Sequence, residues 1–244
     1  MRLLLRPRLG PLGLFLILAS SNGLAQRVID TVAVGPGPGP LAVNAATNKI
    51  YVTNSADYPV NTITVIDGSS DSKVSVNVGL TPYDVAVDST RNRIYVVGMT
   101  SSGLGAVTLI DGATLSTTTM PAGRGAGHVV VNTVTNTIYA SNSGDNTVTV
   151  IDGSTLNIST VSLLQESEPT EMAVNQTTNK IYVVDANASD ITVIDGATLS
   201  TTDVAVGEYP GAIRCGGTFA DRRSSVWLPC KSERRASGRK CRLA

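Results

Sequence analysis

From residue 28 onward, apolar and polar residues alternate along short stretches of the chain. The stretches NTITVID (61–67), NTVTVID (146–152) and SDITVID (189–195) place polar residues and Ile or Val at alternate positions. Alternation of period two in β-branched residues is typical of a half-buried strand. The links AATNK, SGDN and DGATLS are rich in Gly, Asn and Asp, which favour turns. This pattern predicts short antiparallel strands and no helix after the first 25 residues.

The same landmarks return in one order four times. An Ile-Tyr pair recurs with spacings of 44, 44 and 43 residues, at Ile50-Tyr51, Ile94-Tyr95, Ile138-Tyr139 and Ile181-Tyr182. An Asn stands two residues before each pair, at Asn48, Asn92, Asn136 and Asn179. A Val-Asn or Val-Asp step precedes it, ending at Asn44, Asp88, Asn132 and Asn175. An Ile-Asp-Gly unit follows, with its aspartates at Asp67, Asp111, Asp152 and Asp195.

Each repeat contains four strand-like runs, with the run that ends in Val-Asn or Val-Asp placed innermost. Four short antiparallel strands per repeat of this length are typical of one β-propeller blade. One blade cannot bury both faces of its sheet, so neighbouring blades must stack. Residues 26–213 contain no Phe and no Trp, so Val, Ile, Leu, Ala and the repeated Tyr must form the core. The sequence therefore predicts an all-β propeller of about four complete blades in an incomplete or open ring; a β-helix is the alternative architecture.

At this level of detail the repeats resemble a known family. Residues 51–54 read YVTN, the tetrapeptide that names the YVTN-repeat β-propellers, and the other units read YVVG, YASN and YVVD in register. The G-x-x-P that precedes the first strand of a family blade appears at 79–82 and 207–210, whereas the third unit, GRGAGHVVVN, lacks the Pro. The resemblance covers residues 28–213. It implies an exported or surface-layer β-propeller protein, and it leaves the function undefined.

Members of that family often close a ring of seven blades, so four units are few. The segment VIDTVAVG (28–35) precedes the first unit and has the composition of an outer strand. In a complete ring, such a segment joins the last blade and closes the circle. Because the partner blade is missing here, self-association through the incomplete ring is one expectation.

The first 25 residues have the pattern of a signal peptide. Arg2, Arg6 and Arg8 precede an apolar run at 9–19, and small residues at 23 and 25 favour cleavage before Gln26. The apolar run is shorter than the ~20 residues that a membrane span needs, although an uncleaved anchor remains the alternative. We therefore expect a periplasmic, extracellular or cell-surface protein with no transmembrane segment in the mature chain.

Charge and cysteine divide the remainder at residue 213. Residues 26–213 carry seven basic and 17 acidic residues, a net charge of −10, whereas 214–244 carry nine basic and two acidic residues, a net charge of +7. An acidic repeat region argues against nucleic-acid binding. All three cysteines, Cys215, Cys230 and Cys241, lie in the tail, at spacings that suit neither a disulfide framework nor a zinc site. The tail is predicted to be disordered, either as the product of a reading-frame shift or as a genuine basic anchor.

Few side chains suggest chemistry. His128 is the only histidine, and nothing in the sequence places a nucleophile beside it. The aspartates of the Ile-Asp-Gly units lie one per blade, which favours turn capping over Ca²⁺ binding. The segment GPGPGP (35–40) lacks the following helix of a phosphate loop. No cofactor, catalytic residue or metal ligand is predicted.

Loops that enter the innermost strands are the best candidates for binding, because they vary between units while the ATNK and DGAT turns hardly vary. The predicted binding residues in these loops are Asp84, Arg124, Glu171 and Tyr209. Glu168 and Glu208 add carboxylates to the same mouth, which could bind a cation or a basic partner. The sequence thus favours an exported binding scaffold for an unknown protein or small-molecule ligand. The alternative is an extracytoplasmic propeller enzyme of the lactonase or quinoprotein-dehydrogenase type, although the absence of Trp in the blades argues against a quinoprotein.

Overall fold

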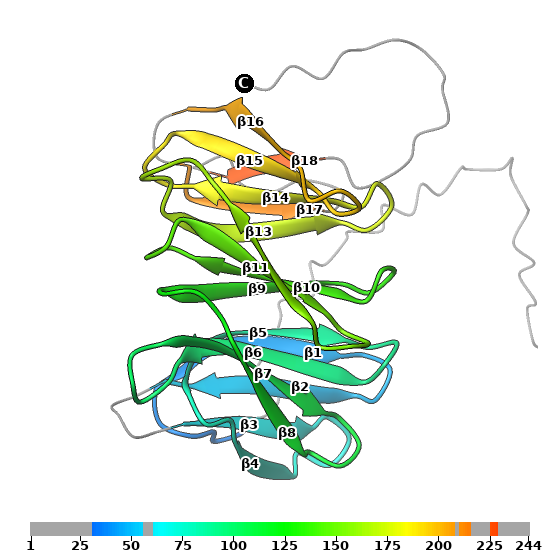
Figure 1. Cartoon of the computed structure of the whole chain (residues 1–244). Coiled ribbons are helices and arrows are strands. Elements are labelled where there is room, and N and C mark those ends of the chain that lie inside the picture. The colour runs from blue at the N-terminus through cyan, green and yellow to red at the C-terminus, as the bar shows by residue number, and fades with distance from the viewer. Residues whose placement is uncertain (1–30, 56–60, 208–209, 216–224, 229–244) are drawn as a thin grey trace, which may run out of the picture. The chain divides into compact units, whose positions relative to one another are not determined.

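Figure 1 shows the computed structural model of the chain, which describes residues 31–55, 61–207, 210–215 and 225–228. The chain divides into two compact units, Met1–Val32 and Ala33–Ala244. Only residues 31 and 32 of the first unit are described, so the predicted signal peptide lies outside the described residues. All the strands of the described residues lie in the second unit.

The second unit is built from four antiparallel sheets of four strands, one per sequence repeat, in agreement with the prediction. Blade 1 comprises β1 (Pro38–Asn44), β2 (Lys49–Asn54), β3 (Thr62–Asp67) and β4 (Lys73–Asn77). Blade 2 comprises β5 (Thr81–Asp88), β6 (Arg93–Met99), β7 (Gly105–Asp111) and β8 (Thr117–Pro121). Blade 3 comprises β9 (Ala126–Asn132), β10 (Thr137–Asn142), β11 (Thr147–Asp152) and β12 (Ile158–Ser162). Blade 4 comprises β13 (Pro169–Asn175), β14 (Lys180–Asp185), β15 (Asp190–Asp195) and β16 (Thr201–Ala205).

The first strand of each blade is the innermost one, because β1, β5, β9 and β13 contact one another in sequence order. The described residues contain no helix, and the four sheets do not close into a ring. Because consecutive strands of a blade are antiparallel, their connections lie at two opposite ends of the blade. We call the end with the β2–β3 type hairpins and the entries to the inner strands the mouth rim. The end with the ATNK and DGAT turns is the far rim.

The repeated landmarks form the far rim. Asn92 adopts a left-handed conformation (φ 51°), and its carbonyl accepts a 2.8 Å hydrogen bond from the amide of Gly112; the same bond recurs in the other three blades. A Cβ on Gly112 would collide with Asn92 Oδ1 and lie 2.7 Å from the backbone oxygen of Asn92, so glycine is required there. Asp111 Oδ1 accepts hydrogen bonds from the amides of Thr114 and Ala113. These bonds lower the pKa of the Asp111 carboxyl, and the bond from Thr114 has the largest effect. The Ile-Asp-Gly aspartates therefore cap turns, as predicted.

Apolar layers between the blades form the core. Each blade has a leading face, directed toward the preceding blade, and a trailing face, directed toward the next. Tyr51 on the trailing face of blade 1 packs in one cluster with Val85 and Ile94 of blade 2. Tyr95 and Tyr139 repeat this packing at the next two junctions, and all three tyrosines are fully buried. Each repeat therefore packs against the next one through the same buried tyrosine.

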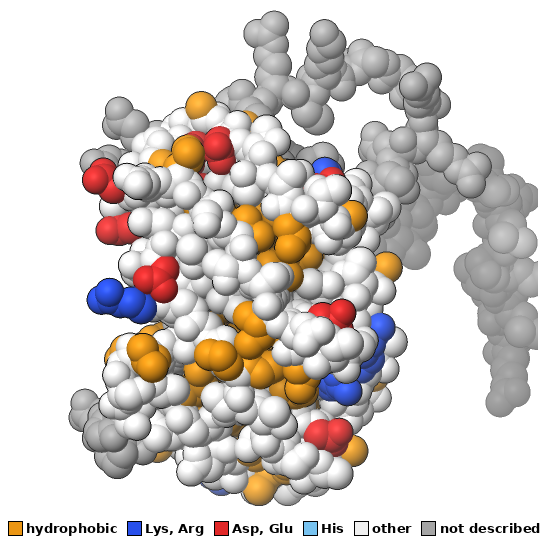
Figure 2. All heavy atoms as spheres, in the orientation of Figure 1, with side chains coloured by type: hydrophobic (Ala, Val, Ile, Leu, Met, Phe, Trp, Pro, Cys, Tyr) orange, Lys and Arg blue, Asp and Glu red, His pale blue; other side chains and the backbone are white. Residues whose placement is uncertain are grey.

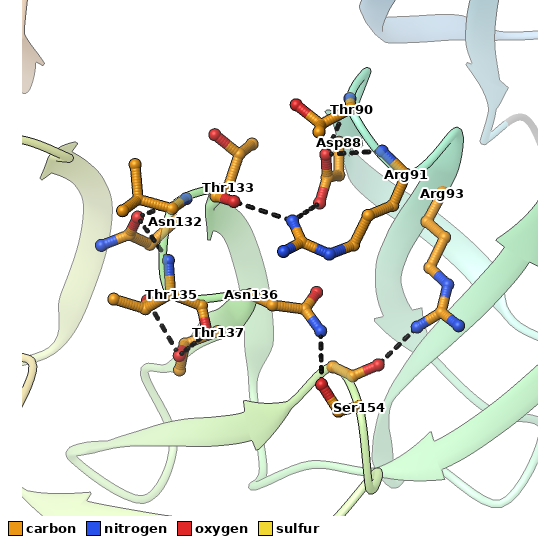
Figure 3. Close-up of polar contacts among 12 residues, drawn as sticks. Asp88, Thr90, Arg91, Arg93, Asn132, Thr133, Thr135, Asn136, Thr137 and Ser154 are labelled. Carbon is orange, nitrogen blue, oxygen red and sulfur yellow. Dashed lines mark hydrogen bonds and ion pairs between the residues drawn. The ribbon is translucent and has the colours of Figure 1, made fainter.

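Polar latches near the far rim also join the blades. The Nδ2 of Asn44 donates to Asn92 Oδ1 across the first junction, and Asn132 donates to Asn179 across the third. The second junction differs because Asp88 replaces the donor asparagine. Two arginines of blade 2 bridge this junction instead (Figure 3). Arg91 Nη1 contacts Asp88 Oδ2 within blade 2 at 2.9 Å and donates to the carbonyl of Thr133 in blade 3 at 2.7 Å. Arg93 donates to the carbonyl of Gly153 in blade 3.

Two features lie at the ends of the stack. Residues 31–35 form no strand, so within its described part the segment 28–35 is not the outer strand that its composition suggests. Instead, the amide of Gly35 donates to Thr64 Oγ1, and the carbonyl of Ala33 accepts from Lys73 Nζ. At the other end, β17 (Ala212–Cys215) contacts β13 and pairs in parallel with β18 (Ser225–Leu228). This two-stranded parallel pair differs from an antiparallel blade; residues 216–224 and 229–244 of the tail lie outside the described residues.

The stack leaves some apolar surface uncovered. Leu41 and Val43, on the leading face of blade 1, are 60% and 53% exposed, whereas Val85, which corresponds to Leu41 in blade 2, is 7% exposed. On the face drawn in Figure 2, hydrophobic side chains also reach the surface between uncharged polar ones, and charged side chains are scattered near the edges. No helix among the described residues is long and apolar enough to cross a membrane.

Candidate functional site: a polar row on the inner strands

Three successive inner strands carry an ionisable side chain at the same position of the repeat. This position lies four residues before the Asn or Asp that ends the strand, and it is occupied by Asp84 in β5, His128 in β9 and Glu171 in β13. Pro40 is the corresponding residue of blade 1. We call Asp84, His128 and Glu171 the inner row. All three side chains are partly exposed, so they are accessible to a ligand at the inner strands.

A register shift in each inner strand orients the row. The pairing of β5 with β6 shifts between Pro82 and Asp84, and β9 shifts against β10 next to Ser141. Such bulges re-aim a side chain relative to the regular ladder. As a result, Asp84 Oδ2 reaches blade 3 and accepts the amide of Val129 at 3.0 Å. His128 makes the corresponding contact one blade later, where its Nδ1 accepts the amide of Met172 at 3.2 Å.

Asp84 and His128 form a pair across the junction of blades 2 and 3. The Nε2 of His128 lies 3.4 Å from Asp84 Oδ2. The side chain of His128 is 28% exposed and that of Asp84 is 15% exposed. Because Nδ1 already accepts a hydrogen bond, a neutral His128 carries its hydrogen on Nε2, the nitrogen that faces the carboxylate. The pair is therefore linked to two backbone amides, which fixes the orientation of both side chains.

The structure gives fewer contacts for the other predicted binding residues than for Asp84. The backbone of Arg124 is held by two bonds to its own blade, since its amide donates to Asp145 Oδ2 at 2.7 Å and its carbonyl accepts from Gly144. Its side chain lies on the mouth rim, and no bond from it to the inner row is found among the described residues. Glu171 is half-buried next to Met172, and Glu168 is exposed in the entry loop of blade 4. Tyr209 and Glu208 lie outside the described residues.

The pair of Asp84 with His128 was missed by sequence reasoning. A usable signal was present, because both residues stand four positions before the landmark that ends their strands, and neighbouring inner strands run side by side. His128 looks isolated along the chain because its partner stands on a different blade.

In the inner row, the side chains of Asp84 and His128 bond to one another and to backbone amides of the next blade. Among the described residues, His128 bonds to Asp84 and to the amide of Met172, and no hydroxyl or thiol that could act as a nucleophile bonds to it. Within the same described part, no group of three or more His, Cys, Asp or Glu side chains is placed to hold a metal ion. What the row offers is hydrogen-bonding capacity and two carboxylates on a rigid sheet scaffold.

Comparisons with known proteins agree on the fold. Residues 77–105 match a family model described as a β-propeller repeat, and no curated protein matches the sequence. The structure is similar to a chain of a nidogen/laminin complex, with a TM-score of 0.59, 14% identity and coverage of 74% of this chain and 69% of that one. It is also similar to hydrazine synthase of Kuenenia stuttgartiensis, with a TM-score of 0.59, 17% identity and coverage of 77% and 64%.

A third similar structure is an auxiliary nutrient binding protein of Bacteroides thetaiotaomicron, with a TM-score of 0.57, 14% identity and coverage of 72% of this chain and 43% of that one. The chain thus spans less than two thirds of the length of two of these three proteins. Identities this low show the fold alone. Together with the four blades, the comparisons establish that the chain is a β-propeller repeat protein.

Proposed function

We propose that this chain is an exported scaffold of the YVTN-repeat type, which binds a positively charged protein or small molecule at the inner row. The proposal of export rests on the signal-peptide pattern of residues 1–25, and the family assignment rests on the tetrapeptide and its three copies in register. A surface-layer or periplasmic location follows from the same resemblance.

The observation that carries the binding proposal is the inner row itself. The two residues before the terminal Asn or Asp of each inner strand are nearly constant between blades, as Ala-Val or Val-Val, whereas the row position changes from Pro40 to Asp84 to His128 to Glu171. Structural requirements of the repeat account for the constant positions, because they form the turns and the apolar layers. They do not require three different ionisable groups at one register. The net charge of −10 over residues 26–213 favours a basic partner, since complementary charge strengthens and accelerates association.

A binding titration tests this proposal. The probe is a fluorescent decalysine peptide, added to the purified full chain at about 0.15 M salt, where charges further apart than ~8 Å are largely screened. The variants Glu171→Gln and Asp84→Asn each remove one carboxylate of the row, and asparagine keeps an oxygen for the amide of Val129. We expect the Kd to rise about threefold to fivefold for each, the value of one exposed ion pair.

The matched control is Asp71→Asn, which removes one exposed carboxylate from a turn at the far rim of blade 1 and keeps a side chain that tolerates its positive φ. This variant is expected to bind decalysine as the wild type does. Equal weakening by the control and the row variants would show that net charge alone attracts the peptide, and the proposed site would be wrong. The absence of any binding would also contradict it.

A further inference from the structure

Blade 4 differs from blades 1 and 3 at one place on its leading face, next to the mouth rim. In blade 1, the Nδ2 of Asn54 donates to Thr62 Oγ1 and Thr64 Oγ1, at 3.1 Å each. In blade 3, Asn142 donates in the same way to Thr147 and Thr149. The corresponding residues of blade 4 are Asp185 for the asparagine and Asp190 and Thr192 for the two threonines. Two carboxyl groups thus replace an amide and a hydroxyl.

The two carboxyl groups face each other in a buried place. Asp185 and Asp190 are directly opposed in the β14–β15 register, and Asp185 is only 1% exposed. The Oδ2 of Asp185 accepts the amide and the hydroxyl of Thr192, at 3.0 and 2.7 Å. The Oδ1 atoms of both aspartates are buried and have no hydrogen-bond partner. Two ionised carboxylates in this position would repel each other in a medium that solvates neither well.

The contacts around the pair also need one more hydrogen than ionised carboxylates and the hydroxyl of Thr192 can supply. The hydroxyl of Thr192 lies within bonding distance of Asp185 Oδ2 (2.7 Å) and of Asp203 Oδ1 (2.9 Å). A hydroxyl has one hydrogen to donate, so one of these contacts joins two acceptors unless a carboxyl group carries a proton. The asparagines of blades 1 and 3 do not meet this difficulty, because their Nδ2 supplies the hydrogens.

We propose that Asp185 and Asp190 share one proton in the folded protein, and that its loss loosens the mouth rim of blade 4. The pair is joined by the hairpin of residues 186–189, so repulsion between two carboxylates acts directly on that hairpin. The hairpin in turn holds the entry loop of blade 4, since the amides of Ala186 and Asn187 donate to the carbonyls of Glu168 and Ser167. Blade 4 therefore contains a pH-sensitive contact that blades 1 and 3 lack.

The charged groups of blade 4 near the pair are acidic, and the facing blade carries His128, which bonds to the amide of Met172, and Asp145 in its mouth-rim hairpin. Asp203 on β16 shares the hydroxyl of Thr192, and Glu166 and Glu168 lie in the entry loop. β10, on the facing blade, has no charged residue. Glu171 lies within the register shift of β13, next to Met172, which packs on the leading face with Val183. β17 packs against the trailing face of β14, where its Ile213 contacts the cluster of Val184.

The only basic residue between 163 and 205 is Lys180, which is bonded to Asp195 at the far rim. Burial, with the charge of Asp190 adding to it, raises the pKa of Asp185 to about 7, and burial also raises the pKa of Asp190. A carboxyl group whose pKa is raised by folding favours the folded state at acid pH, and this contribution is lost as the pH rises toward and through its folded value. The pair should therefore weaken blade 4 between about pH 5 and 8.

The test is the pH dependence of unfolding in the full chain. Asp185→Asn recreates the residue of blades 1 and 3, whose amide donates at any pH. Between pH 5 and 8, the folding equilibrium constant of the wild type is expected to fall about tenfold or more relative to that of Asp185→Asn, since one unit of pKa shift corresponds to a factor of ten. The wild type should also lose amide-exchange protection at residues 186–191 over this range.

Two variants and one addition complete the test. Asp190→Thr, which recreates Thr62 and Thr147, should reduce the pH dependence, because it removes the charge of Asp190 while Asp185 stays buried; it provides the test if Asp185→Asn fails to fold. Asp71→Asn at the far rim should keep the slope of the wild type. If neither variant of the pair changes the slope, the shared proton does not exist. A rise in the denaturant midpoint on adding CaCl₂ at pH 8, absent in Asp185→Asn, would also overturn the proposal, because the pair would then hold a cation rather than a proton.

Discussion

The side-chain amide of Asn44 in blade 1 donates a 2.9 Å hydrogen bond to the side-chain carbonyl of Asn92 in blade 2. Asn44 is fully buried, and its own Oδ1 accepts the amides of Ala46 and Thr47. One side chain therefore closes a turn and joins two blades. At the next junction, Asp88 has no hydrogen to donate, and the Oδ1 of Asn136 is buried without a partner.

The first prediction concerns this latch. Asn44→Asp keeps the acceptor for the turn but leaves Asn92 Oδ1 without its donor, so we expect it to lower the free energy of unfolding by about 1–3 kcal/mol. Asp88→Asn makes the opposite change: it supplies a donor for Asn136 and loses an ion pair whose arginine side chain is 34% exposed, a contact of about 0–1 kcal/mol. Denaturant unfolding of both variants is the measurement. Destabilisation of similar size in the two would contradict the role assigned to the latch.

The second prediction concerns the glycine of the Ile-Asp-Gly unit. A methyl group at Gly112 would collide with Asn92, and relief of that collision would disturb both the turn and the latch to Asn44. We expect Gly112→Ala to cost about 2 kcal/mol, in the range of overpacked sites. Gly207→Ala is the matched control, because a Cβ at Gly207 meets nothing within 4 Å. Thermal unfolding should show a lower Tm for the first variant alone; equal effects would remove the steric explanation.

The third prediction uses a buried hydroxyl. Tyr51 is fully buried, its OH has no hydrogen-bond partner, and burial raises the pKa of its phenol. Tyr51→Phe removes the unsatisfied group and keeps the ring against blade 2, so the free energy of unfolding should stay the same or rise by up to about 1 kcal/mol. A clear loss of stability would show that the hydroxyl has a partner in solution.

The fourth prediction compares equivalent positions in different blades. Val85→Ala should cost about 2 kcal/mol, because Val85 is packed against Tyr51 in the layer between blades 1 and 2. Leu41→Ala should cost less than about 0.5 kcal/mol in the monomer, since Leu41 is 60% exposed. Unfolding should be measured at several protein concentrations. A large, concentration-dependent cost for Leu41→Ala would reveal a second chain on the leading face of blade 1.

Much of the fold could be predicted because the sequence repeats it. The Ile-Tyr pair and the Ile-Asp-Gly unit fix the register of two strands and their turn four times over, so errors in one unit are corrected by the others. The segment 28–35 was harder to predict, because it has the composition of a strand but forms none over residues 31–35. A sequence pattern shows what a segment can form, and pairing depends on what lies beside it.

The candidate site was predictable only in part. Variation between units pointed to the positions of Asp84 and Glu171 on the inner strands. It did not reveal that Asp84 lies beside His128, because that contact crosses from one blade to the next and depends on the register shift within the inner strand. The opposition of Asp185 and Asp190 was hidden for a similar reason, since it follows from pairing across a hairpin rather than from spacing alone.

The most direct test of the central claim, that the inner row is a binding surface, is an NMR titration of His128. Because the chain contains a single histidine, its imidazole signals need no assignment by mutation, and its neutral form should carry the hydrogen on Nε2, since Nδ1 accepts from the amide of Met172. The account predicts that decalysine shifts these signals saturably, with the same Kd as the fluorescence titration. Saturable binding of the peptide that leaves the His128 signals unmoved would contradict the account.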